Sequence, residues 1–192
     1  MTPGRLIVLN GTTSAGKTTL ATHLQAELVR TGECWVVIGL DDFLAKLPEE
    51  WIQIRDHVGA YAEDGMVFET VDGKIECRIG PVGNQLLAAY RGAVGDAARA
   101  GLNVIVDEVL LSGAGWTGWR DELRGLDPLW VRVDADLDIL EARERERGDR
   151  VVGMARAQRA VVHEHAIYAV EVDTGTLDPP ASVAAIMAAL TG

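Results

Sequence analysis

Residues 11–18, which read GTTSAGKT, combine glycines, a lysine and a hydroxyl at a spacing that suits phosphate binding. They match the pattern G-x-x-x-x-G-K-[ST], with an apolar run before them and a helical pattern after them. Gly11 and Gly16 let the backbone turn and approach the phosphates, while successive N–H groups point inward from the start of a helix. Lys17 suits the β- and γ-phosphates, and the Thr18 hydroxyl suits Mg²⁺. An incidental glycine-rich turn is the alternative, which the neighbouring strand and helix disfavour.

This P-loop predicts a nucleoside triphosphate and Mg²⁺ as ligands. The residues expected to hold the nucleotide are Gly11, Thr12, Thr13, Ser14, Ala15, Gly16, Lys17, Thr18 and Thr19.

A second acidic site follows the apolar run 104–106, which leads into Asp107 and Glu108. Beside a P-loop, a strand ending in acid typically holds Mg²⁺. Asp107 is therefore expected to hold Mg²⁺ through a water, together with Thr18, or else to orient the nucleophile. Two solvated acids at a strand end are the alternative.

The run 35–39 also ends next to a pair of acids, Asp41 and Asp42. Strand ends border the ligand crevice of an open α/β sheet, so a carboxylate here can accept a proton from an attacking hydroxyl. Asp41 is the expected general base. Asp42 is the alternative base or a helix cap, and both acids could instead cap a helix that starts at Phe43.

The stretch 141–150, EARERERGDR, concentrates arginines that could close over a nucleotide and neutralise the transferring phosphoryl group. Glutamates alternate with them, so a solvated helix face crossed by salt bridges is an equal alternative.

The stretch 48–80 mixes aromatic residues, charges and glycines without a clear period, and we expect it to be a substrate-binding insertion. Trp51, Ile52, Tyr61, Met66 and Phe68 could line an acceptor pocket or form local core; taken alone, their pattern favours core. The candidate acceptor-binding residues are Asp42, Trp51, Ile52, Phe68 and Glu108.

Short apolar runs alternate with longer amphipathic segments, which predicts an α/β fold with a parallel sheet. The expected strands are Arg5–Asn10, Trp35–Gly39, Leu102–Asp107, Leu129–Asp134 and Tyr168–Asp173. The expected helices are Gly16–Thr31, Pro81–Ala100, Ala135–Arg147, Val152–Val162 and Pro180–Leu190. Gly32, Gly101 and Gly148 stand where these helices would end.

The composition points to a single domain over residues 1–192. Acidic residues outnumber basic ones by 29 to 18, giving a net charge of −11, so nucleic acid and membrane partners are not expected. With two cysteines, no signal peptide and no apolar stretch of the ~20 residues that span a membrane, the chain is expected to be cytoplasmic with two buried free thiols.

The sequence resembles the chloramphenicol phosphotransferases in segments that keep their order from the first strand to the last. These segments are LNGTTSAGKT (9–18), GLDDFLAKLP (39–48), IGP (79–81), VIVDEVLL (104–111), LW (129–130), ERGDRVVGMA (146–155), VVHE (161–164) and YAVEVDT (168–174).

The resemblance implies a P-loop kinase-like three-layer sandwich with a central parallel sheet and a helical lid. It implies ATP-dependent phosphorylation of a hydroxyl on a small molecule, such as chloramphenicol or a related antibiotic, in resistance or self-protection. It implies that Asp41 and Lys17 are catalytic. It also implies that Arg143, Arg147 and Arg150 are catalytic arginines of the lid.

Residues 49–78 depart from the family pattern, so other acceptors stay open. The alternatives are a toxin-like or metabolic kinase of a sugar nucleotide, nucleoside or sugar acid, and a nucleotide-binding switch. The switch is disfavoured because the chain has no N/T-K-x-D motif for reading guanine.

Overall fold

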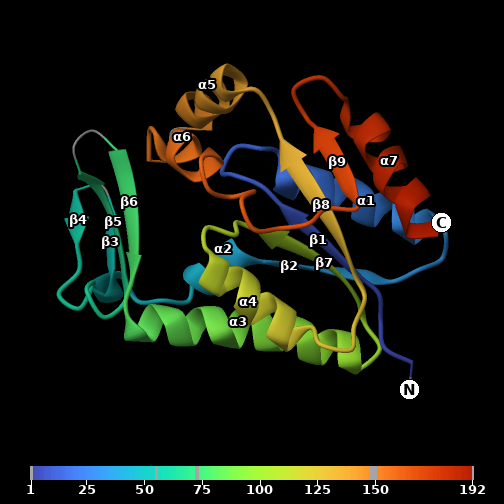
Figure 1. The fold of residues 1–192 in the computed structure, drawn as a ribbon, viewed down its shortest axis with the longest axis horizontal. Helices are drawn as coiled ribbons and strands as arrows, with labels where there is room; N and C mark the ends of the chain where they lie inside the picture. The colour runs from blue at the N-terminus through green and yellow to red at the C-terminus, as the bar shows by residue number, and fades with distance from the viewer. Residues whose placement is uncertain (1, 55, 72–73, 148–150, 192) are drawn as a thin grey trace.

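Five parallel strands form the central sheet of this computed structural model, which describes residues 2–54, 56–71, 74–147 and 151–191 (Figure 1). The strand order is β2 (Trp35–Gly39), β7 (Asn103–Glu108), β1 (Leu6–Asn10), β8 (Pro128–Asp134) and β9 (Val170–Asp173). All five predicted strands are confirmed, each to within two residues at either end. The α/β fold with a central parallel sheet is confirmed with them.

The register of the sheet brings the chemically interesting strand ends to one edge. Gly39 of β2 lies opposite Asp107 of β7, and Asn10 of β1 lies opposite Glu108. Because the strands are parallel, the P-loop after β1 and the acids after β2 and β7 meet at their carboxyl ends.

Helices cover both faces of this sheet, because alternate residues of the buried strands point to opposite sides. Ile7 and Leu9 face the helices α1 (Lys17–Arg30) and α7 (Pro179–Thr191) in one core. Leu6 and Val8 face α3 (Pro81–Arg99) and α4 (Gly113–Glu122) in the other. The result is the expected three-layer sandwich (Figure 1).

A second sheet occupies most of the stretch that had no clear period. After the 3₁₀ turn Glu49–Trp51, strands β4 (His57–Val58), β3 (Ile52–Ile54), β5 (Met66–Val71) and β6 (Lys74–Ile79) pair in that order. This small sheet lies beside the main one, and its β6 contacts α6 (Met154–Arg159) (Figure 1).

The remaining helices frame the carboxyl edge of the main sheet. The short helix α2 (Leu40–Leu44) follows β2 directly, and α5 (Leu137–Arg147) leads to α6. The predicted helix over 152–162 is shorter than expected, and α4 was not predicted. The short α2 begins at Leu40, three residues before the alternative helix start at Phe43. The helix end expected at Gly148 lies outside the described residues. Among the described helices, none is long and apolar enough to cross a membrane.

Candidate active site

The P-loop between β1 and α1 has the geometry that its glycines predict. A side chain at Gly11 would place its Cβ 2.0 Å from the carbonyl oxygen of Val133, so only glycine fits. Gly16 caps α1 with φ of 86°, and Ser14 adopts φ of 62°, a strained value for a residue with a side chain. The loop therefore ends at the start of α1, where an anion is favoured.

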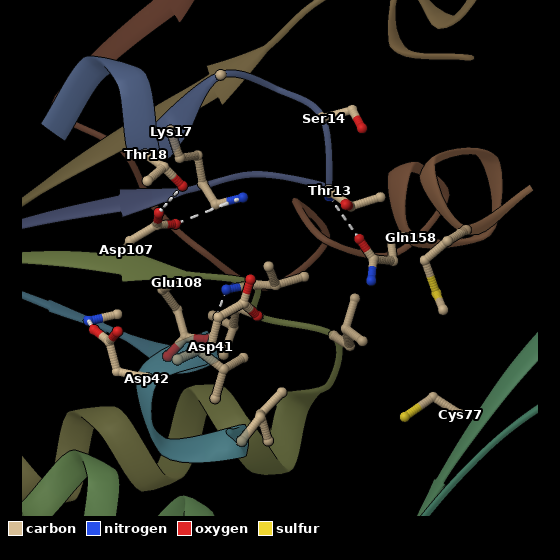
Figure 2. Close-up of a pocket in the computed structure, with 18 of the residues that line it drawn as sticks. Thr13, Ser14, Lys17, Thr18, Asp41, Asp42, Cys77, Asp107, Glu108 and Gln158 are labelled. Carbon is tan, nitrogen blue, oxygen red and sulfur yellow. Dashed lines mark hydrogen bonds and ion pairs between the residues drawn. The ribbon is translucent and has the colours of Figure 1, made fainter. Parts of the chain in front are cut away.

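Lys17, Thr18 and Asp107 meet at the centre of the site (Figure 2). Lys17 Nζ donates to the carbonyl oxygen of Thr12 over 2.8 Å and lies 3.7 Å from Asp107 Oδ1. The Thr18 hydroxyl donates to Asp107 Oδ2 over 2.6 Å. The structure thus brings together the lysine and both oxygens that the sequence assigned to phosphate and metal.

These two oxygens fit Mg²⁺ by their chemistry. Mg²⁺ prefers oxygen ligands and is usually held by one or two protein groups, with water and phosphate oxygens completing the octahedron. No group of three or more His, Cys, Asp or Glu residues that could hold a metal occurs in the described part of the chain. A threonine–aspartate pair next to a P-loop is therefore the arrangement suited to a metal that arrives with a nucleotide.

Asp41 and Asp42 have different surroundings, although they are neighbours in α2. Asp42 Oδ2 accepts the N–H of Gly39 over 3.0 Å and so caps the first turn of α2. Asp41 lines the same pocket as Lys17 and Asp107, and its side chain extends into that pocket (Figure 2). The capping role therefore belongs to Asp42, although both acids line the pocket.

Glu108 is buried at the end of β7 beneath the acceptor side of the pocket. Its two carboxylate oxygens accept the N–H of Val109 and the indole N–H of Trp119, each over 2.7 Å. Burial raises the pKa of Glu108 to about 7, against the lowering effects of these two donors, Lys17 and Arg91. Glu108 is thus a pocket residue whose oxygens are already engaged by the protein.

Arg143 of α5 lies across the P-loop from the metal pair. Its guanidinium donates to the hydroxyl and the carbonyl oxygen of Thr174, both over 2.9 Å, and to the carbonyl oxygen of Ser14 over 3.4 Å. The Thr174 hydroxyl also donates to the carbonyl oxygen of Ala15 over 2.9 Å. This end of the pocket is completed by residues of α7 and the loop before it, namely Leu177, Pro179 and Ser182.

The other predicted lid arginines differ in their placement. Arg147 is exposed and lines the pocket, whereas Arg145 is exposed and lies outside its wall. Arg150 lies outside the described residues. Glu144, which alternates with these arginines, is buried and accepts the N–H groups of Gly153 and Ala155 over 2.7 and 2.8 Å. One glutamate therefore ties α5 to the start of α6 instead of forming a solvated face.

A cavity of about 1150 Å³ runs from the P-loop past Asp41 into an apolar chamber. The apolar side chains of this chamber come from α2, α3 and the small sheet, and the cavity is also lined by Asp42, Cys77 and Arg91. The apolar side chains are Leu40, Leu44, Ile52, Ile54, Met66, Phe68, Ile79 and Leu87. Ile52 and Phe68 therefore lie where the sequence placed them. Trp51 does not, because it stacks on Tyr61 at 5.2 Å between ring centroids and is absent from the wall. Packing of two adjacent aromatic rings overrides the pocket role at that position.

Within the P-loop, Gly11, Thr12 and Ala15 shape the turn without lining the cavity.

Burial raises the pKa of the chamber thiol Cys77 to about 11, while Cys34 is free but exposed, contrary to expectation.

Sequence reasoning missed Gln158, Thr174 and Arg91, which all line the cavity. Thr174 directly follows the predicted strand 168–173, so the strand-end rule could have found it. Gln158 and Arg91 had no local signal, because each reaches the site only through the packing of its helix.

A parallel sheet with a P-loop after its first strand and helices on both faces defines the P-loop kinase fold, and solved structures agree. APS kinase CysC of Mycobacterium tuberculosis, solved with AMPPNP and APS, superposes with a TM-score of 0.68 at 13% identity over all of both chains. A gluconokinase from Sinorhizobium meliloti gives 0.59 at 16% identity, over 99% of this chain and 93% of that one. The tunicamycin resistance protein of Deinococcus radiodurans gives 0.62 at 17%, over 97% and 95%.

The chain belongs to the chloramphenicol phosphotransferase-like family, whose model matches residues 4–191. A protein present in two strains of Mycobacterium tuberculosis, described as "Putative O-phosphotransferase", is 34% identical over 186 residues, which is 91% of this chain and 76% of the relative. The predicted family is confirmed. Membership implies a nucleotide that gives a phosphoryl group and an acceptor that takes it.

Proposed function

We propose that this protein transfers the γ-phosphoryl group of Mg-ATP to a hydroxyl of a small, largely apolar molecule, of the kind found among antibiotics. The observation that carries the proposal is the position of Asp41, at the junction between the P-loop and the apolar chamber. A carboxylate at that junction can contact the hydroxyl of an acceptor in the chamber while the phosphates lie on the loop.

Donor binding follows from the P-loop geometry. The backbone N–H groups from Ser14 to Thr19 and the α1 N-terminus hold the β-phosphate. Lys17 Nζ has three N–H donors, so it keeps its bond to the Thr12 carbonyl and contacts the β- and γ-oxygens with the others. Thr18 and Asp107 would hold Mg²⁺, which supplies charge neutralisation at the β- and γ-phosphates. Arg143 and Thr174 line the pocket where α5 meets the P-loop.

Asp41 acts as the general base of the transfer. The acceptor oxygen forms a bond to the γ-phosphorus as the bond from that phosphorus to the β–γ bridging oxygen breaks, and ADP keeps the bond's electron pair. The acceptor proton passes to the Asp41 carboxylate. Losing such a base typically lowers the rate by about 10²–10⁴.

The helices α5 and α6 act as the lid of this site, and the small sheet β3–β6 supplies the acceptor wall. Arg143 and Arg147 neutralise the charge of the phosphates from the lid side, and Arg150 is assigned there only by resemblance. Closing the lid excludes water, which would otherwise compete with the acceptor hydroxyl for the phosphoryl group.

The chamber favours an apolar acceptor over a sugar acid or a sugar nucleotide. Its wall carries eight aliphatic, thioether or aromatic side chains, from Leu40 to Leu87, and such a surface binds a polyhydroxylated or phosphorylated body poorly. The Asp41 carboxylate would also repel an anionic acceptor.

The test is acceptor-dependent ADP release with Mg-ATP across chloramphenicol, other hydroxylated antibiotics, nucleosides and sugar acids. We expect turnover with an apolar alcohol and loss of that turnover in Asp41→Asn. Asp121→Asn is the matched control, since Asp121 is an exposed α4 residue paired with Arg124. Turnover confined to sugar acids or nucleotides would contradict the proposed apolar acceptor. Turnover of Asp41→Asn equal to that of the wild type would show that Asp41 is not the general base.

A further inference from the structure

The peptide unit between Thr12 and Thr13 is bound on both sides. Its carbonyl oxygen accepts from Lys17 Nζ over 2.8 Å, and its N–H donates to Gln158 Oε1 over 2.7 Å. The P-loop lysine and a glutamine of α6, which lies in the lid, therefore attach to opposite ends of one peptide group.

The orientation of the Gln158 amide is forced by this contact. A backbone N–H can only donate, so the amide oxygen must face Thr13 and the NH₂ group must point the other way. Gln158 lines the cavity, and Figure 2 shows its amide nitrogen on the pocket side, away from Thr13. In the described part of the chain no acceptor pairs with this nitrogen, so two donors face the pocket.

These contacts form one chain of hydrogen bonds that starts at a positive charge. The Lys17 ammonium polarises the Thr12 carbonyl, which makes the Thr13 N–H a stronger donor to Gln158. The same polarisation makes the Gln158 NH₂ a stronger donor in turn. A polarised N–H is suited to a negatively charged oxygen, and its hydrogen bonds to charged groups are about twice as strong as neutral ones.

We propose that Gln158 donates from Nε2 to a non-bridging oxygen of the γ-phosphoryl group, and so is a catalytic residue of the transfer. This inference rests on the proposed function. The γ-phosphoryl group lies within reach of Lys17, and one peptide unit with two hydrogen bonds connects that lysine to Gln158. The α- and β-phosphates are expected further along the loop, because the anion-binding start of α1 lies there.

Two contacts fix α6 so that Gln158 is held in place. Glu144 accepts the N–H groups of Gly153 and Ala155 at the start of the helix. The next residue after the glutamine, Arg159, donates from Nε to Asp134 Oδ1 over 3.2 Å at the end of β8. The amide is therefore held towards the loop in advance. A group that stabilises charge developing in a transition state has to be preorganised in this way.

Because the contact involves only the γ-phosphoryl group, it should affect the binding of AMPPNP, which has this group, and not the binding of ADP, which lacks it. Gln158→Glu keeps an oxygen acceptor for the Thr13 N–H and nearly the same volume, but it replaces the donor with an oxygen that repels phosphate. Gln158→Met removes both hydrogen bonds without adding charge. Gln85→Glu makes the same change in charge at an exposed position of α3 and is the control.

The experiment measures the dissociation constants of ADP and of AMPPNP with Mg²⁺ by calorimetry, so no acceptor is needed. We expect Gln158→Glu and Gln158→Met to weaken AMPPNP binding at least about tenfold, with ADP binding changed less than about threefold. Gln85→Glu should leave both constants unchanged, and thermal melting of each variant identifies any loss of folding.

Equal effects on both nucleotides, or no effect on either in a folded variant, would overturn the role of Gln158 and leave the proposed function standing. Wild-type protein that binds neither nucleotide would overturn the proposed function itself. If Gln158→Glu fails to fold, Gln158→Met decides by the same comparison.

Discussion

The Thr18 hydroxyl donates to the Asp107 carboxylate over 2.6 Å, although 89 positions separate the two residues in the chain. The parallel pairing of β1 with β7 produces this contact, because Leu9 lies opposite Asp107 and the P-loop follows β1 directly. The contact places a hydroxyl oxygen and a carboxylate oxygen side by side, and both would hold Mg²⁺ at this edge of the sheet.

Removing either oxygen should abolish the effect of Mg²⁺ on the enzyme. We expect Thr18→Val and Asp107→Asn each to lower acceptor-dependent turnover by at least about 10²-fold, since one transition-state charge contact is typically worth that much. Calorimetry of ADP binding with and without Mg²⁺ gives a second readout, in which both variants lose the metal dependence. Thr22→Val, one turn further along α1, removes only a hydroxyl bonded to the Thr18 carbonyl and serves as the control. An unchanged Mg²⁺ dependence in both variants would contradict the assignment.

The neighbours Asp41 and Asp42 should separate activity from stability. Asp42→Ala removes the acceptor of the Gly39 N–H and is expected to cost about 0.5–2 kcal/mol of unfolding free energy. Asp41→Asn is expected to leave urea denaturation unchanged and to lower turnover by about 10²–10⁴. The reverse pattern, with Asp42 essential for turnover and Asp41 for stability, would exchange the two roles.

The sequence predicts the main sheet well because its central strands are buried and read as apolar runs. All five residues of β1 are buried, and the strand ends at the glycine-rich motif. In the small sheet, β3 and β4 escape prediction because they have only three and two residues, too few to show a period. Likewise α4 carries three glycines in its ten residues, GAGWTGWRDE, and its helix depends on packing of Trp119 and not on propensity.

The sequence likewise predicts some residues of the candidate site and misses others. Strand-end reasoning finds Asp41 and Asp107 because β2 and β7 are neighbours, with Gly39 opposite Asp107. It cannot choose between Asp41 and Asp42, since that choice depends on which carboxylate turns back to the Gly39 N–H. Gln158 is 145 positions from its partner Thr13, and only the packing of α6 over the loop reveals it.

The buried Glu144 should stabilise the lid much more than its neighbours do. Glu144→Leu leaves the N–H groups of Gly153 and Ala155 without an acceptor, which costs about 1–3 kcal/mol for each buried donor. We expect faster hydrogen exchange in α5 and α6 and a loss of unfolding free energy of about 2–5 kcal/mol. Glu141→Gln breaks an exposed ion pair with Arg156 between the same two helices and should cost less than about 1 kcal/mol. Equal losses in the two variants would show that Glu144 has no special role.

The free energy of unfolding should decrease at acidic pH, in part because His163 takes up a proton more readily in the unfolded chain. Burial and the positive charges of Arg132 and Arg159 lower the pKa of His163 to about 4, against the raising effect of Asp134. In the unfolded chain a histidine takes up its proton near pH 6.5, so between pH 6.5 and 4 the unfolded state binds more protons than the folded one. Stability is therefore fully present above pH 6.5 and falls as the pH drops towards 4.

His163→Gln should remove this part of the pH dependence, because the amide can still bond to the Tyr168 hydroxyl that His163 Nδ1 contacts at 2.7 Å. We expect the difference in unfolding free energy between pH 7 and pH 4.5 to shrink by about 1–2 kcal/mol, less than the full shift because the ring is partly exposed. Urea denaturation at the two pH values measures it, with His57→Gln, an exposed histidine of the small sheet, as the control. If both variants keep the wild-type difference, His163 is protonated in the folded protein and the loss of stability in acid arises from the carboxylates.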